Sequence, residues 1–174
     1  MIKRIATLAL FISIAASAFA LDGTWTANLE SDRDHLHLNI TTDRSNLGTS
    51  MSIASFGTLT PSQINAAAAT PVTFELRRDA GTIAFEGTFR DGKGAGRFTF
   101  TPDRTYFDKV RTLGIEPSRT GDERLFVLAL HDVSTTYIKA MQDAGYKTTL
   151  EKYLAMRVLG ITPEYAREME SLTR

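Results

Sequence analysis

The sequence predicts an α+β fold: an antiparallel β-meander of about six strands, followed by a short array of about five helices arranged as helical hairpins. Apolar residues alternate with a period of two from Leu21 to Thr101, as in strands with one buried face. From Pro102 onward their spacing becomes helical, and this second part repeats itself. We therefore divide the chain into an N-terminal segment 1–20, a β region 21–101 and a helical region 102–174.

The N-terminal segment has the pattern of a secretory signal peptide. A basic start, "MIKR", precedes the apolar run "IATLALFISIAAS", and Ala18 and Ala20 supply the small residues before a cut. The apolar run is shorter than a typical membrane span, although an uncleaved anchor is the alternative interpretation. The pattern predicts cleavage after Ala20 and a periplasmic or secreted bacterial protein.

The composition of the mature chain argues against two classes of partner. Without Lys3 and Arg4, 18 of the 20 basic residues remain against 20 acidic ones, so the net charge is about −2. We therefore expect no nucleic-acid partner. No second long apolar run follows the first, so we also expect no stable membrane insertion after signal cleavage. The chain contains no cysteine, which excludes disulfides and a lipid-modified cysteine.

The β region contains six segments typical of strands. Two of the turns between them are marked by "DAG" at Asp79–Gly81 and by "DGKG" at Asp91–Gly94. One interruption predicts a short helix, because Thr60 can cap it and Pro61 suits its first position. The predicted strands are "TWTANL", "HLHLNI", "MSIASF", "VTFELR", "TIAFEGTF" and "RFTFT".

The helical region contains three segments that align on their tyrosines. They read "YFDKVRTLG" from Tyr106, "YIKAMQDAG" from Tyr137 and "YAREMESLT" from Tyr165. Apolar residues at i, i+1, i+4 and i+7 predict one apolar stripe on each helix. Gly114 and Gly145 stand where a helix ends in the left-handed conformation.

Two further helices, "DERLFVLALHDV" and "LEKYLAMRVLGI", alternate with these segments. Thr120 with Glu123, and Thr148 with Glu151, have the spacing of a capping box. Ser134 and Thr162 are the predicted caps of the Tyr137 and Tyr165 helices. Since no hairpin can bury its stripe alone, we expect neighbouring hairpins and the sheet to cover it.

No catalytic, cofactor or metal site is predicted. The sequence has no recognisable nucleophile motif, and "GKGAG" at Gly92–Gly96 fits a hairpin turn better than a phosphate loop. His35 and His37 point to one face of a strand, but a zinc site requires at least one further ligand. We interpret both histidines as solvent-facing, with metal binding as the alternative.

Two sets of aromatic residues are candidates for packing or for binding. Tyr106, Tyr137 and Tyr165 form a stripe that either packs between helices, the favoured interpretation, or contacts a partner. Aromatic residues of the β region could instead line a cavity for a small apolar ligand, as in small β-barrels, although packing is again favoured. These residues are Trp25, Phe74, Phe85 and Phe98.

Part of the chain resembles a known family. The run "VTFELRRDAGTIAFEGTFRDGKGAGRFTFTPDRTYFDKVRTLG", with "YIKAMQDAGY" and "MRVLGITPEYAREM", is similar to the extracytoplasmic tail module of bacterial antirepressor-type membrane metallopeptidases of the beta-lactam sensor class. It also resembles free-standing secreted relatives. The resemblance covers Val72 to Glu170 and implies a sensor-like or accessory module. It implies no peptidase activity, because the zinc motif and membrane helices of those enzymes are absent.

Three hypotheses about function follow. The leading one is an exported, non-enzymatic interaction or accessory module with a protein partner in the cell envelope and a link to envelope sensing. The alternative is a protein that binds a small apolar ligand on its sheet. The weakest is an uncharacterised hydrolase or metal-binding protein that uses His35 and His37.

Overall fold

The predicted α+β fold is confirmed. The computed structural model describes residues 21–172, so the predicted signal peptide, residues 1–20, lies outside the described part. One antiparallel sheet of six strands is followed by the helical region. None of the described helices is long and apolar enough to cross a membrane.

The sheet consists of two three-stranded meanders that meet in its middle. The strand order is β3-β2-β1-β6-β5-β4, so the first and last strands of the chain pair at the centre. Their register places Trp25 opposite Gly96 and Leu21 opposite Phe100. The strands are β1 (Leu21–Leu29), β2 (His35–Thr41), β3 (Asn46–Ser52), β4 (Thr70–Arg78), β5 (Gly81–Arg90) and β6 (Lys93–Pro102).

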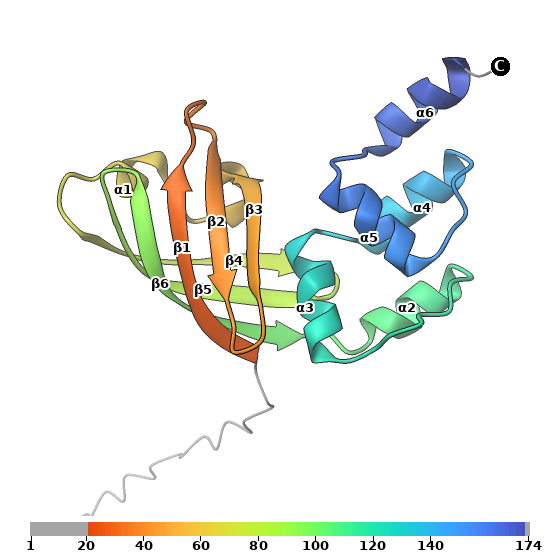
Figure 1. Ribbon diagram of the computed structural model, residues 1–174, viewed down its shortest axis with the longest axis horizontal. Helices are drawn as coiled ribbons and strands as arrows, with labels where there is room; N and C mark the ends of the chain where they lie inside the picture. Colours follow the sequence, from red (N-terminus) through yellow and green to blue (C-terminus); the bar gives the residue numbers. More distant parts are fainter. Residues whose placement is uncertain (1–20, 173–174) are drawn as a thin grey trace, which may run out of the picture.

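The sheet is strongly bent, so that β1–β3 run across the direction of β4–β6 (Figure 1). Two short helices, the 3₁₀ helix η1 (Ile53–Phe56) and α1 (Pro61–Ile64), connect the edge strands β3 and β4. The predicted strand "MSIASF" is therefore wrong beyond Ser52. Ile53 and Phe56 are one 3₁₀ turn apart, which turns both side chains into the core. The predicted cap at Thr60 is confirmed, with Pro61 in the first turn.

The helical region contains the five expected helices. Ser134 and Thr162 act as predicted, because their hydroxyls accept from the backbone N–H groups of Tyr137 at 3.0 Å and Tyr165 at 3.2 Å. The helices are α2 (Tyr106–Thr112), α3 (Asp122–Leu130), α4 (Thr135–Asp143), α5 (Leu150–Val158) and α6 (Pro163–Leu172).

Two predicted capping boxes are wrong by one residue. The cap of α5 is Thr149 and not Thr148, since the Thr149 hydroxyl accepts from the backbone N–H of Lys152. The cap position of α3 is Gly121 and not Thr120, and no side chain caps this helix. Gly121 has φ 115°, a conformation that favours glycine and sets the start of α3 one residue later.

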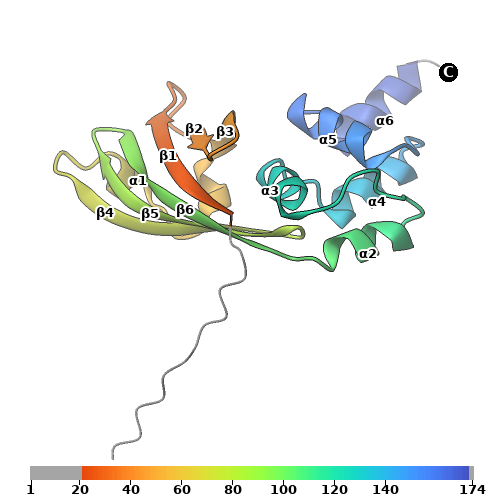
Figure 2. The same ribbon diagram turned by 60° about the horizontal axis from the view of Figure 1, so that its bottom comes forward.

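Helix α3 joins the sheet to the helical array (Figure 2). Its Phe126 ring stacks on Phe98 with centroids 5.4 Å apart and meets the edge of Phe100 at the same distance. Buried side chains form one continuous cluster from Trp25 in β1 to Ala166 in α6. The β and α regions therefore share a single core.

Polar contacts also hold the array against the β4–β5 turn. One Asp79 carboxylate oxygen accepts hydrogen bonds from the backbone N–H and the hydroxyl of Thr135, at 2.8 and 2.7 Å. Arg78 lies 3.5 Å from the carboxylate of Asp132, which follows α3. These contacts place the start of α4 directly beside the end of β4.

Candidate interaction surface at the end of the helical array

Each of the first two tyrosines of the repeat fastens its helix to the residue just before the cap of the next tyrosine helix. The Tyr106 hydroxyl donates to the carbonyl oxygen of Val133 at 2.5 Å, and the Tyr137 hydroxyl donates to that of Ile161 at 2.9 Å. Val133 and Ile161 are equivalent, because each directly precedes the residue that caps the next helix. Burial raises the pKa of both phenols. These two tyrosines therefore pack between helices.

The third tyrosine of the stripe lies at the surface. Tyr165 is 52% exposed, whereas Tyr137 is 6% exposed. Among the residues that the structure describes, no acceptor binds the Tyr165 hydroxyl, and no helical unit follows α6. The structure thus divides the predicted stripe into two packed members and one exposed member.

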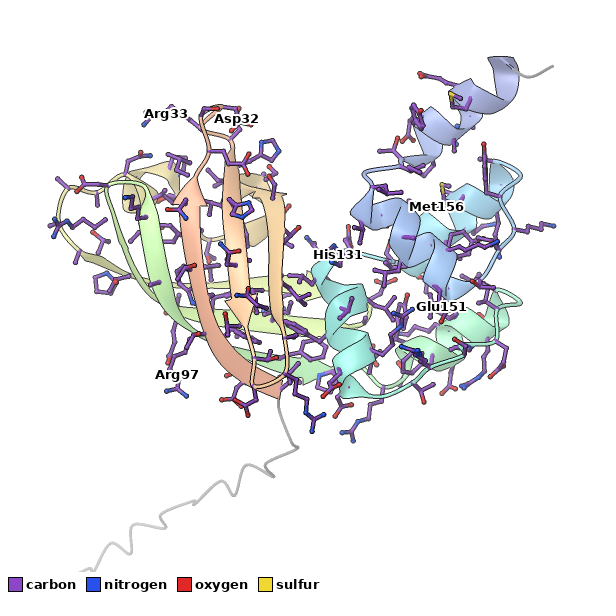
Figure 3. The ribbon with its side chains drawn as sticks, in the orientation of Figure 1. Asp32, Arg33, Arg97, His131, Glu151 and Met156 are labelled. Carbon is purple, nitrogen blue, oxygen red and sulfur yellow. The ribbon has the colours of Figure 1, made fainter. Side chains whose placement is uncertain are left out.

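The 28-residue offset relates α5–α6 to α3–α4, and we call each of these helix pairs a unit. Arg157 of α5 binds back onto the preceding unit, α3–α4. Its guanidinium lies over the Tyr137 ring, 4.8 Å from the centroid. Its Nε donates to the carbonyl oxygens of His131 and Asp132, both at 3.1 Å, and Nη2 donates to the Asp132 carboxylate at 2.8 Å. Figure 3 shows His131 at the end of α3 that faces α5. Helix-end carbonyls, a carboxylate and an aromatic ring together hold one arginine.

The same turn recurs at the end of α5, where its equivalent positions are exposed. Asp132 and Gly160, which are 28 positions apart, both have a left-handed backbone, with φ 52° and 72°. His131 corresponds in the same way to Leu159, and Tyr137 to Tyr165. The backbone part of the arginine site is therefore present twice.

We call Val158, Leu159 and Tyr165 the terminal face. Their exposed fractions are 57%, 75% and 52%. The equivalents of Val158 and Tyr165 in the preceding unit are Leu130 and Tyr137, which are only 1% and 6% exposed. In Figure 1, α5 ends on the side of the helical array that faces the sheet, and α6 leads away from the sheet. Large apolar side chains that are buried in one unit are thus exposed in the next.

The aromatic residues considered for a ligand cavity fill the core instead. Phe74 stacks on Phe85 with centroids 4.8 Å apart, and Trp25 meets Phe74 edge-on at 5.4 Å. Phe98 completes the set against Phe126. None of these side chains is more than 2% exposed. Three hollows in the described part of the chain have none of Trp25, Phe74, Phe85 and Phe98 in their lining.

The Trp25 indole is hydrogen-bonded to the backbone of two neighbouring strands. Its Nε1–H donates to the carbonyl oxygens of Glu86 at 3.2 Å and Arg97 at 3.0 Å. A side chain at Gly96 would place its Cβ only 1.9 Å from the Glu86 carbonyl oxygen. Glycine at this position therefore permits the close approach of β5 and β6 beneath the indole.

One open hollow of about 580 Å³ lies between the β2–β3 turn, the start of β1 and the start of α3. Leu47, Phe126 and Val127 supply apolar walls. An ion pair between Arg44 and Glu123 crosses from the turn to the helix. The hollow combines an apolar lining with charged groups at its rim.

The two strand histidines do not assemble a metal site. His35 Nδ1 lies 2.6 Å from the Asp32 carboxylate at the β1–β2 turn, and His37 is exposed. Figure 3 shows Asp32 at the tip of this hairpin, away from the helices. Among the described residues, no group of three histidine, cysteine or acidic side chains could hold a metal ion.

Comparisons of the chain with protein-family models, curated proteins and solved structures returned no match. The resemblance to the tail module of beta-lactam sensor peptidases therefore stays a prediction. Assignment of a function rests on the geometry of this chain alone.

The sequence analysis missed the arginine site. Arg157 and the turn residues Asp132 and Gly160 were not considered as candidates. The signal was present in the 28-residue offset, which aligns Gly160 with Asp132 and Leu159 with His131. The offset predicts equivalent positions, but only the folded chain places Arg157 on the preceding turn.

Proposed function

We propose that this protein is an exported, non-enzymatic interaction module that binds a protein partner of the cell envelope through its terminal face. The observation that carries this proposal is the exposure of Val158 and Tyr165, whose equivalents Leu130 and Tyr137 are buried by the following helices. Export follows from the predicted signal peptide, and a link to envelope sensing follows from the family resemblance.

The chemistry of the terminal face suits protein recognition. Burying a large aliphatic side chain contributes about 1.5–3 kcal/mol, so covering Val158 and Leu159 would add substantially to affinity. Tyrosine is among the residues that most often dominate the energetics of interfaces. Helix α6 begins beside these residues and carries an ion pair between Arg167 and Glu164 at 2.9 Å, which gives the patch a polar border.

The test is capture by the full chain, produced with its signal and a C-terminal tag, from the native envelope fraction. A specific partner should be recovered with the parent and lost with Leu159→Glu. Lys93→Glu, at the start of β6, is the matched control and should retain the partner. Both variants should show the circular dichroism of the parent. A partner retained equally by Leu159→Glu contradicts the proposed surface.

A second candidate function is the binding of a small ligand in the hollow beside α3. The supporting observation is its volume of about 580 Å³ together with the apolar side chains of Leu47, Phe126 and Val127. Native mass spectrometry of protein purified from the envelope should then detect a bound mass that Val127→Glu removes. Detection of the bare chain alone, in the parent, contradicts this candidate.

A further inference from the structure

The arginine contact inside the array indicates what the terminal face recognises. Arg157 touches both the ring of Tyr137 and the turn after α3, through the carbonyls of His131 and Asp132. The contact crosses from one helical unit to the next. It therefore shows, within this chain, how one helical unit binds the unit that follows it.

The turn after α5 has the geometry of the turn after α3. The backbone N–H of Val133 donates to the Leu128 carbonyl at 3.0 Å, and that of Ile161 donates to the Met156 carbonyl at 2.8 Å. Both turns thus end their helix with the same backbone hydrogen bond. Among the described residues, no donor occupies the carbonyl oxygens of Leu159 or Gly160.

We propose that the terminal face binds an arginine carried by an amphipathic helix of a different protein. The arginine would donate to the carbonyl oxygens of Leu159 and Gly160 and lie over the Tyr165 ring, as Arg157 does one unit earlier. Apolar residues beside this arginine would cover Val158 and Leu159. This inference rests on the proposed function and specifies the chemistry of its partner.

Charge and geometry favour arginine at this site. The last carbonyls of a helix carry partial negative charge, so the end of α5 attracts a cation. The planar guanidinium can stack on a ring while it donates to two carbonyls, which the compact ammonium group of lysine does less well. Gly160 replaces Asp132, however, so the carboxylate of the internal site is missing.

A second copy of this chain fits the site less well than another protein. The arginine that has the right surroundings, Arg157, is already bound to Asp132 and Tyr137 within its own chain. Freeing it would break these contacts and expose the Tyr137 ring. The occupant is therefore a helix from a protein with its own unpaired arginine.

The probe for the test is a synthetic peptide with the sequence of residues 148–172, which carries Arg157 in its natural context. The matched control peptide contains Arg157→Gln. Isothermal titration of the full mature chain, residues 21–174, should give a dissociation constant at least about tenfold lower for the arginine peptide. The protein variant Tyr165→Ala should remove this difference. Tyr165→Ala also distinguishes two modes of peptide binding. A peptide that docks on the terminal face needs the Tyr165 ring of the protein, whereas a peptide that displaces the chain's own α5–α6 hairpin does not.

A gain-of-function variant sharpens the test. Gly160→Asp restores the carboxylate at a left-handed position that Asp132 already adopts, and a Cβ at Gly160 meets no atom within 4 Å. It should tighten binding of the arginine peptide by about tenfold and leave the glutamine peptide unchanged.

Equal binding of the two peptides, or no binding of either one, would overturn the inference. Neither result decides the proposed function, because partner capture that depends on Leu159 is measured separately. Suppose that the parent captures the partner, Leu159→Glu does not, and the two peptides bind equally. The proposed surface is then correct, and the proposed recognition of an arginine is wrong. Self-association of the parent chain that Leu159→Glu abolishes would identify a second copy as the occupant and would also overturn the inference.

Discussion

At the scale of single residues, the tyrosines show how one motif serves two roles. Tyr106 and Tyr137 each bury a ring and bind the carbonyl that precedes the next helix cap. Tyr165 has the same place in its own helix but is half exposed. The difference comes from the neighbours, since a following unit covers the first two rings and none covers the third within the described chain.

Tyr137→Ala should lower the free energy of unfolding by about 3 kcal/mol, because it removes a buried ring and leaves a cavity. Tyr165→Ala should change it by no more than about 0.5 kcal/mol, since this ring is mostly at the surface. Urea denaturation followed by circular dichroism measures both. Equal effects of the two substitutions would show that Tyr165 also packs in the core.

His131 gives stability a dependence on pH. Burial, and then the nearby charge of Arg157, lower the pKa of His131 below 6.5. The folded chain therefore binds this proton less readily than the unfolded chain, with Asp132 and Arg78 as the other charged groups near the turn. The contribution of neutral His131 to the free energy of unfolding is fully present above about pH 6.5, and it declines as the pH falls toward the lowered pKa.

Denaturation curves between pH 7.5 and about pH 5 measure this effect. His131→Gln should flatten the pH dependence of the unfolding free energy in that range. Some carboxylates have a lowered pKa and affect the free energy of unfolding only at lower pH. Examples are Asp103 beside Lys109 and Asp122 beside Arg104. An unchanged slope in His131→Gln would contradict this account.

At the scale of elements, helix starts depend on which residue adopts the extended cap conformation. Thr148 and Thr149 are both threonines, and the spacing to Glu151 favoured Thr148. In the structure the Tyr153 hydroxyl accepts from the backbone N–H of Thr148 at 3.3 Å and donates to the Tyr146 carbonyl at 2.6 Å. This contact holds Thr148 in the preceding turn and leaves Thr149 as the cap.

Thr149→Ala should therefore cost about 1 kcal/mol of stability, the typical cost of losing a cap. Thr148→Ala should cost clearly less, because the contact of Thr148 is made by its backbone. Thermal unfolding of the two variants, compared at the same protein concentration, distinguishes them. A larger loss for Thr148→Ala would restore the capping box that the sequence predicted.

At the scale of the whole molecule, α3 couples the two regions. Phe126 is 2% exposed and lies between the sheet residues Phe98 and Phe100 and the rest of the helical core. Because the core is continuous, the sheet and the array should unfold together in one transition.

Phe126→Ala should reduce the free energy of unfolding by about 4 kcal/mol, in the range for a buried phenylalanine. Tryptophan fluorescence reports on the sheet through Trp25, and far-ultraviolet circular dichroism reports mainly on the helices. In the parent the two signals should change at the same denaturant concentration. Transitions that separate in the parent would mean that the two regions are independent.

Local patterns predicted most of the elements. Alternation in "TIAFEGTF" and the turn "DGKG" led to β5, β6 and the turn between them, and the apolar stripe from Tyr137 led to α4. The error at "MSIASF" arose because Met51 and Ile53 alternate as in a strand, whereas Ile53 and Phe56, three residues apart, fit one 3₁₀ turn. Alternation alone cannot tell these apart over such a short segment.

The sequence by itself determined which residues are apolar, at what period, and that the helical unit occurs more than once. Such information lies in neighbours along the chain, where the spacing of side chains is set by the helix or the strand. Only the tertiary structure decided that β1 pairs with β6, that the Trp25 indole donates to Glu86 and Arg97, and that Arg157 binds the turn after α3. These contacts join residues far apart in sequence, and their existence depends on how the complete core packs. The exposure of Tyr165 belongs to this second group, since burial is a property of neighbours in space.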